Sequence, residues 1–390
     1  MAEDRKGLDK LIYVSPRSWD RVAVDDAEFA YESSRAKAHF AHLMKAEDYQ
    51  SLINNQADEI EWIAHWAREF NAANYDVKDT VIDTLTKGYS DNDELLIELC
   101  GGEKSDFAKM FILKNDYHNA KVIAKNFLLG QLNSQDAKRV LRVNKSLFQK
   151  TANVELEFLV QWVLSYLNND KSNSILPELH EKYFSMALER LLEEEAQSAE
   201  IDLAAVDINL DKAYYLHFLE LADEKKHKGY RDLLLDYISI QADSSNLQSF
   251  YRCKKRKLPL EEFERQFVAA GRIELDEFEE KYLLDEEKIN LGVEFNAKDS
   301  LVGSLLELAE RSSINEFLNE FTQARDNLLI RLADKAQDLI YGAEVLFALW
   351  QANRVEIINL QLIHAAHQLG RDEDTTVRKL RDIYGGQLRV

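Results

Sequence analysis

Three stretches of the sequence place an acidic residue three positions before an asparagine, and these side chains are the clearest candidates for polar chemistry. A carboxylate accepts hydrogen bonds from backbone N–H groups, and an asparagine amide both accepts and donates them. An acidic residue at a helix N-cap, with an amide three positions later, can therefore satisfy the first free N–H groups of a helix. The stretches are DYHNAKVIAK with Asp116 and Asn119, DSSNLQSFYR with Asp243 and Asn246, and EIINLQLIHA with Glu356 and Asn359.

The spacing predicts that the first two stretches begin helices, with Asp116 and Asp243 as N-caps. In the third stretch the helical pattern runs through Glu356 without a break, which leaves the capping role open there. The positions one and four after each asparagine are small or apolar and would face a core. Two interpretations stay open for these residues: ordinary helix caps, or three equivalent helix ends that frame one shared surface.

The three stretches divide the chain into comparable parts, because their acidic residues lie 127 and then 113 residues apart. Asn119 and Asn359 are followed eleven residues later by Gly130 and Gly370, whereas the second stretch reaches Gly271 only after a longer interval. Each stretch also follows an aromatic or aliphatic segment: FAKMFIL, LLLDYISI and EVLFALW. This pattern predicts a helix–turn–helix unit that is used three times.

Other candidates for catalysis or metal binding are weak. His364 and His367 share one helix face, but no cysteine or carboxylate in the sequence is tied to them, so no metal site is predicted. The segment CGGEKS at 100–105 lacks the spacing of a phosphate-binding loop, and HEKYF at 180–184 is not the metalloprotease motif. We therefore predict no catalytic residue and no cofactor. The 70 acidic residues leave a helical enzyme with a carboxylate site as an open alternative.

Composition predicts the elements that must position these side chains. The 390 residues include 3 Pro and 13 Gly, so turn-forming residues are scarce and an all-α fold is expected. A net charge of −21 disfavours nucleic acid as a partner. No window approaches the roughly 18 uncharged apolar residues of a membrane span. Two cysteines without metal-site spacing fit a reducing compartment, and the N-terminus lacks the apolar core of a secretory signal.

Four segments resemble one known family, the C-type subunits of archaeal and bacterial V-type ATPases, whose counterpart in the eukaryotic V-ATPase is the d-type subunit. They are FAYESSRAKAHFAHLMKAEDYQSLI, DSSNLQSFYRCKK, LEEFERQFVAAGRIELDEF and ANRVEIINLQLIHAAHQLG. The resemblance covers residues 28–390. The chain departs from the family pattern in a longer segment before Tyr31, and in His364 and His367 where aliphatic or basic residues are expected.

The resemblance implies three similar helical subdomains in a pseudo-threefold arrangement, forming a funnel with a central hollow. The expected division is an N-terminal leader at 1–27 and subdomains at 28–145, 146–275 and 276–390. The resemblance also implies a non-catalytic rotor subunit on the cytoplasmic face of a membrane, without a membrane span of its own. It would couple the proteolipid ring to the central stalk during ATP-driven transport of protons or sodium ions.

The residues expected at partner contacts or in the core of the repeats are the six of the three stretches and one basic residue. They are Asp116, Asn119, Asp243, Asn246, Arg252, Glu356 and Asn359. The alternative function is a helical adaptor that binds other proteins without enzymatic activity. A helical-repeat adaptor would show a period of about 34–47 residues, and thirds of about 120 residues count against it.

Overall fold

The computed structural model describes residues 29–54, 81–130, 152–168, 176–197, 202–225, 229–284, 289, 292–296 and 301–386. These residues form mainly α-helices, and no strand occurs among them. The prediction of an all-α fold is therefore confirmed. The predicted leader at 1–27 lies outside the described residues.

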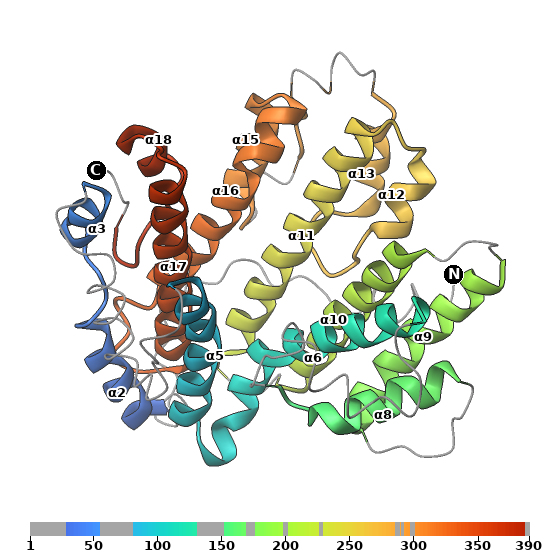
Figure 1. Ribbon diagram of the computed structural model, residues 1–390, viewed down its shortest axis with the longest axis horizontal. Helices are drawn as coiled ribbons and strands as arrows, with labels where there is room; N and C mark the ends of the chain where they lie inside the picture. The colour runs from blue at the N-terminus through green and yellow to red at the C-terminus, as the bar shows by residue number, and fades with distance from the viewer. Residues whose placement is uncertain are drawn as a thin grey trace.

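The helices differ widely in length, from 5 to 26 residues. They are α2 (Ala30–Phe40), α3 (Ala46–Ile53), α5 (Val81–Leu99), α6 (Ser105–Leu128), α8 (Leu156–Leu167), α9 (Glu178–Gln197), α10 (Leu203–Glu224), α11 (Arg231–Lys255), α12 (Leu260–Gln266), α13 (Leu275–Tyr282), α15 (Gly303–Arg311), α16 (Ile314–Asp334), α17 (Ala343–Gln368) and α18 (Glu373–Val377). In Figure 1, α11 runs between three groups of helices: α2, α3, α17 and α18; α8 and α9; and α12 and α13.

The long helices α6, α11 and α17 carry the three acidic–Asn stretches in their interiors. Each packs against the helix that precedes it in the chain, which is α5, α10 or α16. The aromatic segments and the acidic–Asn stretches therefore form single helices, and the predicted helix–turn–helix unit is wrong. No Gly or Pro interrupts these segments, so nothing stops the backbone ladder from continuing through them.

The three long helices end in the same way. Gly130 and Gly370 follow α6 and α17 with φ of 67° and 60°, and Lys257 follows α11 with φ of 56°. Each of these residues lies eleven positions after the asparagine of its helix. A left-handed residue at this place closes a helix C-terminus, and glycine adopts that conformation at the lowest cost. The second helix thus uses a lysine where the other two use glycine.

Aromatic rings fill the place where the three long helices meet. The ring of Phe111 on α6 lies 5.1 Å from that of Tyr237 on α11, and 5.3 Å and 5.2 Å from those of Phe347 and Trp350 on α17, between centroids. All four side chains are buried, and we call them the aromatic hub. These rings join the three long helices through side-chain contacts. The funnel and its central hollow stay predictions.

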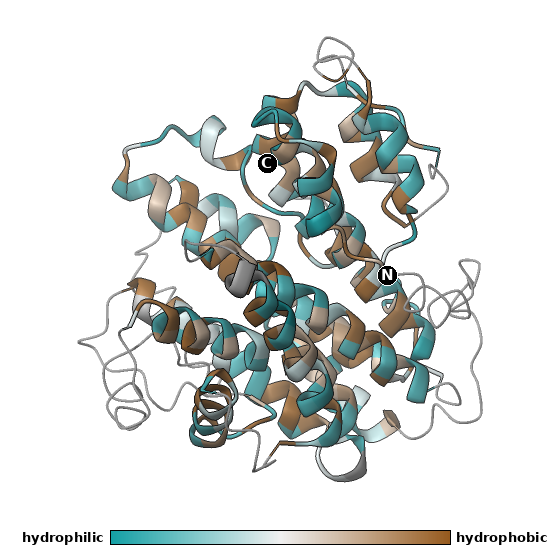
Figure 2. Ribbon diagram, turned by 90° about the vertical axis from the view of Figure 1, so that its right-hand side faces the viewer, coloured by the Kyte–Doolittle hydropathy of each residue, from teal (hydrophilic) through white to brown (hydrophobic). Residues whose placement is uncertain are grey.

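The first described helices pack beside the last ones. α2 contacts α5 and α17, and α3 contacts α18. The Ser33 hydroxyl donates to the Gly342 carbonyl at 3.1 Å and accepts from the Gly342 N–H at 3.0 Å. Figure 2 shows hydrophilic and hydrophobic residues alternating along the helices. The predicted subdomain boundaries stay a prediction, and the structure adds that residues 30–53 contact the final third of the chain.

Candidate functional site: three buried clamps

The carboxylate of Asp116 holds the segment that leads into α8. Its Oδ1 accepts hydrogen bonds from the backbone N–H groups of Asn153 at 2.9 Å and Val154 at 3.1 Å. Its Oδ2 lies 3.2 Å from Nε2 of His180 on α9. Asp116 is fully buried, at 0% exposure. It is therefore not the N-cap of its own helix, as predicted, but an acceptor for N–H groups just before another helix.

Asp243 does the same for the segment that leads into α13. Both of its carboxylate oxygens lie 2.9 Å from the N–H of Arg272, and Oδ1 also accepts from Ile273 at 3.1 Å. Burial raises the pKa of Asp243 to about 7, against the lowering effect of these N–H groups. The predicted N-cap role is wrong here too, because Asp243 lies in the interior of α11. In both helices the carboxylate is satisfied by tertiary contacts, which local spacing does not encode.

The third acidic residue holds the segment that leads into α3. Oε1 of Glu356, in the interior of α17, accepts a hydrogen bond from the N–H of Met44. Val154, Ile273 and Met44 are buried apolar residues that each lie two positions before the first residue of a helix. The three acidic side chains thus make equivalent contacts. In the third case the held segment comes from the opposite end of the chain.

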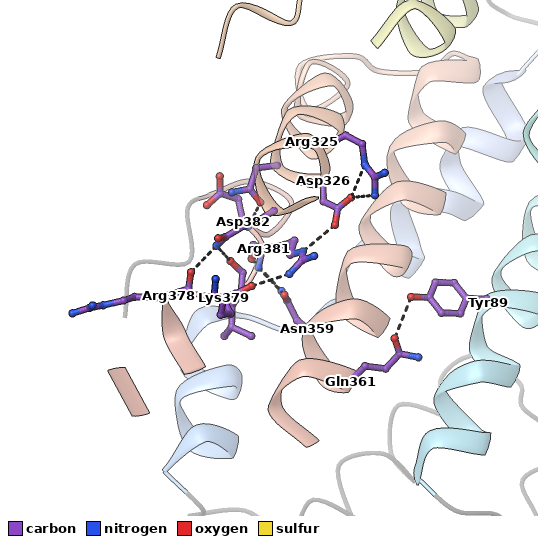
Figure 3. Close-up of polar contacts among 12 residues, drawn as sticks. Tyr89, Arg325, Asp326, Asn359, Gln361, Arg378, Lys379, Arg381 and Asp382 are labelled. Atoms are coloured by element: carbon purple, nitrogen blue, oxygen red, sulfur yellow. Dashed lines mark hydrogen bonds and ion pairs between the residues drawn. The ribbon is translucent and has the colours of Figure 1, made fainter. Parts of the chain in front are cut away.

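The asparagines of α11 and α17 hold a second segment. Asn246 donates to the Val268 carbonyl at 2.9 Å and accepts from the Val268 N–H at 2.8 Å. Asn359 donates to the Arg381 carbonyl at 3.1 Å and accepts from the Arg381 N–H at 2.8 Å, as Figure 3 shows. In both cases the partner lies 22 residues after the asparagine. Each asparagine amide therefore donates to the carbonyl and accepts from the N–H of one backbone residue, the pattern that a neighbouring β-strand would make.

Asn119 differs from its two counterparts. It is buried, and neither atom of its amide has a hydrogen-bond partner among the residues that the structure describes. The residue 22 positions further on, Leu141, lies outside the described residues. We call each acidic–Asn pair with the segments it holds a clamp: the first on α6, the second on α11 and the third on α17.

Ion pairs and aromatic residues surround the clamps. In the third clamp, Nε of Arg381 donates to Asp326 at 2.9 Å, and Asp326 also accepts from Arg325 at 2.9 Å (Figure 3). In the first clamp, His180 stacks edge-on to His217 with ring centroids 4.7 Å apart. Burial, and then the charge of His180, lower the pKa of His217 to about 3, so its ring is neutral near pH 7.

The clamps are suited to holding structure together rather than to acid–base chemistry. The carboxylates of Asp116 and Asp243 are buried and already accept backbone N–H groups. Within the described ranges, no group of three or more His, Cys, Asp or Glu side chains could hold a metal ion. A search of the same residues finds no helix long and apolar enough to cross a membrane.

The structure buries six of the seven predicted site residues and exposes the seventh, Arg252, on α11. Whether any of them contacts a partner stays a prediction. Sequence reasoning missed the segments that the carboxylates hold. A signal was present, because NVELEF at 153–158 and RIELDEF at 272–278 are alike and both lead into a held helix.

Fold and clamps together define an all-α scaffold in which three long helices each hold a remote segment through an acidic side chain, and two of them hold a second segment through an asparagine. A family model described as "ATP synthase (C/AC39) subunit" matches residues 33–378. The chain belongs to this family and is thus a subunit of the V-type ATPase class. A search of curated proteins finds no match.

Proposed function

We propose that this chain is a non-catalytic rotor subunit of a V-type ATPase. It would act as a socket that couples the central stalk to the membrane proteolipid ring during ATP-driven transport of protons or sodium ions. It would sit peripherally on the cytoplasmic face of the membrane, held there by the ring. Family membership supports this role, since the family supplies an accessory rather than a catalytic subunit.

The observation that carries the proposal is the threefold repetition of the clamps. A part that transmits rotation must keep its shape when force is applied at one end and resisted at the other. Here each long helix is tied to segments remote in the sequence by buried hydrogen bonds, mostly to a carboxylate. Hydrogen bonds to charged groups contribute about 1.5–3 kcal/mol each, more than those between neutral groups. Three such clamps favour a rigid body that meets other subunits, and they leave no accessible acid–base pair at these positions.

The test is to purify the tagged chain from gently solubilised membranes and to identify the proteins that accompany it by mass spectrometry. We expect proteolipid, stalk and head subunits. The control carries the same tag on an unrelated acidic helical protein. Recovery of the chain alone, or with soluble proteins only, would contradict the rotor role and favour the adaptor. Turnover by the isolated chain would instead favour an enzyme.

A second assay addresses coupling. Membranes that lack the chain should retain ATP hydrolysis by the head but lose ATP-driven ion transport, and addition of the purified chain should restore transport. Transport that persists at full rate without the chain would contradict the socket role.

A further inference from the structure

Two cations lie against the ring of Trp350 at the aromatic hub. Nζ of Lys114, on α6, is 5.5 Å from the centroid of the ring. The guanidinium carbon of Arg354, on α17, is 4.8 Å from the same centroid and 5.2 Å from that of Tyr89 on α5. Both cationic side chains are partly buried, whereas Trp350 itself is buried.

A third cation, Arg325 of α16, faces the same region. The charges of Arg325 and Arg354 both act on Lys114 and on Tyr237 of α11. The charge of Arg354 also acts on Tyr214 of α10. The charges of these cations thus act on groups of α6, α10 and α11. We call Lys114, Arg325 and Arg354 the cation cluster.

Two carboxylates near the cluster, Asp93 and Asp326, raise the pKa of Lys114 by their charge, and both also accept hydrogen bonds from other residues. Asp93 accepts from Nε1 of Trp350 at 2.8 Å and from Nδ2 of Asn115 at 3.0 Å. Asp326 is shared by Arg325 and Arg381. No ion pair joins Lys114 or Arg354 to a carboxylate in the described part of the chain.

This excess of positive charge is unexpected in a chain with 70 acidic and 49 basic residues. Burial, and then the charge of Arg354, lower the pKa of Lys114 to about 7. The charged form of Lys114 is therefore disfavoured in the free chain. An anion between the cations would offset their repulsion and would return Lys114 to its charged form.

We propose that Lys114, Arg325 and Arg354 form a binding site for carboxylate side chains on an acidic polypeptide segment of a partner protein. Guanidinium groups recognise carboxylates through paired N–H···O bonds, and the lysine adds a single donor. The partly buried ring of Tyr89, beside Arg354, offers apolar contact to the aliphatic part of a Glu or Asp side chain. Nucleic acid is disfavoured by the net charge of −21, and the burial of Trp350 leaves no ring face for a base to stack on. The site does not depend on the rotor role.

The experiment uses the complex recovered from membranes with the full-length chain. A carbodiimide joins a lysine amine to a carboxylate by an amide bond when the two are in direct contact, with loss of water to the reagent. We expect a cross-link from Lys114 to an acidic residue of another protein in the complex. The control is Lys109 on the same helix, which is exposed and pairs with Asp106 of its own helix. Cross-links of Lys114 only to Asp93 or Asp326, or none, would overturn the proposal and leave the rotor role intact.

Substitution gives an independent measurement. Lys114→Met keeps the length of the side chain and removes its charge, and we expect retention of the partner to weaken about tenfold. Lys109→Met should leave retention unchanged. Thermal unfolding of both variants checks that they fold. Equal retention by the two variants would overturn the proposal. A second result would also overturn the proposal: inorganic phosphate raises the melting temperature of the unmodified chain but not that of Lys114→Met. The site would then bind small anions.

Discussion

Substitution of Gly271 by alanine tests the second clamp directly. Gly271 lies just before the two residues whose N–H groups bond to Asp243. A Cβ atom at Gly271 would lie 1.9 Å from Oδ1 of Asp243, 2.7 Å from its Cγ and 3.2 Å from its backbone nitrogen. The backbone of Gly271 thus approaches α11 so closely that only glycine fits.

The expected cost follows from this overlap. The carboxylate is held within a helix and cannot retreat far, so residues 271–273 must move away by about 1 Å to restore normal contact. This movement lengthens the N–H···O bonds of Arg272 and Ile273 to a buried carboxylate. Loss of such bonds costs about 1.5–3 kcal/mol each and is not fully additive. We expect Gly271→Ala to lower the free energy of unfolding by about 3–4 kcal/mol.

Alanine substitutions at two other glycines serve as controls, because they show what alanine does where no close approach exists. Gly370 has φ of +60° with no atom within 4 Å of an added Cβ, so Gly370→Ala should cost about 1 kcal/mol of backbone strain. Gly386 has neither feature, and Gly386→Ala should change stability by less than about 0.5 kcal/mol. Urea unfolding, followed by circular dichroism, would rank the three. If Gly271→Ala unfolds at the same urea concentration as Gly386→Ala, the close approach does not matter and the reasoning is refuted.

Three further predictions concern the asparagines, the cation cluster and the N-terminal helices. Asn246→Ala should cost about 2–4 kcal/mol in urea unfolding because it leaves the N–H and C=O of a buried residue unpaired, and Asn119→Ala should cost less than half of that; equal costs would contradict the pairing. The lowered pKa of Lys114 means that its charge penalises the folded state fully below pH 7, and less as pH rises toward its ordinary value of 10.5. Lys114→Met should therefore raise the melting temperature most at about pH 6 and hardly at all near pH 10.5, and a gain that grows with pH would show the sign to be wrong. Ser33→Ala should speed hydrogen exchange in α2, whereas Ser34→Ala, which loses only a bond within its own helix, should not; identical exchange would show that the Ser33–Gly342 contact does not hold α2.

The sequence was sufficient to predict the helical class and to find the three acidic–Asn pairs. It misled on their role, because the same spacing suits both a helix cap and a buried acceptor. Asp116 differs from an N-cap because it accepts hydrogen bonds from the N–H groups of Asn153 and Val154, which lie 37 and 38 residues further along the chain. Helix propensity and residue spacing describe neighbours along the chain, so no local pattern predicts such a long-range contact.

Two other features escaped prediction for related reasons. Lys257 adopts the left-handed conformation that Gly130 and Gly370 adopt, but a lysine carries no signal for it. The contact of Ser33 with Gly342 spans 309 residues, and nothing near either residue predicts the other. The cation cluster was also missed, because its members come from three helices and are unremarkable one at a time.

The same 309-residue separation has a consequence for synthesis of the chain. A ribosome that adds about 5–20 residues each second needs roughly 15–60 s to make the stretch between Ser33 and Gly342. During that time α2 and α3 have emerged, but the helix that covers them does not yet exist. Side chains that are buried in the complete fold, such as Tyr49 and Leu52, must stay exposed to solvent during this time or be covered by chaperones. The third clamp is thus the last to form, and translation that stalls before α17 would release a nascent chain whose first helices are ready to aggregate.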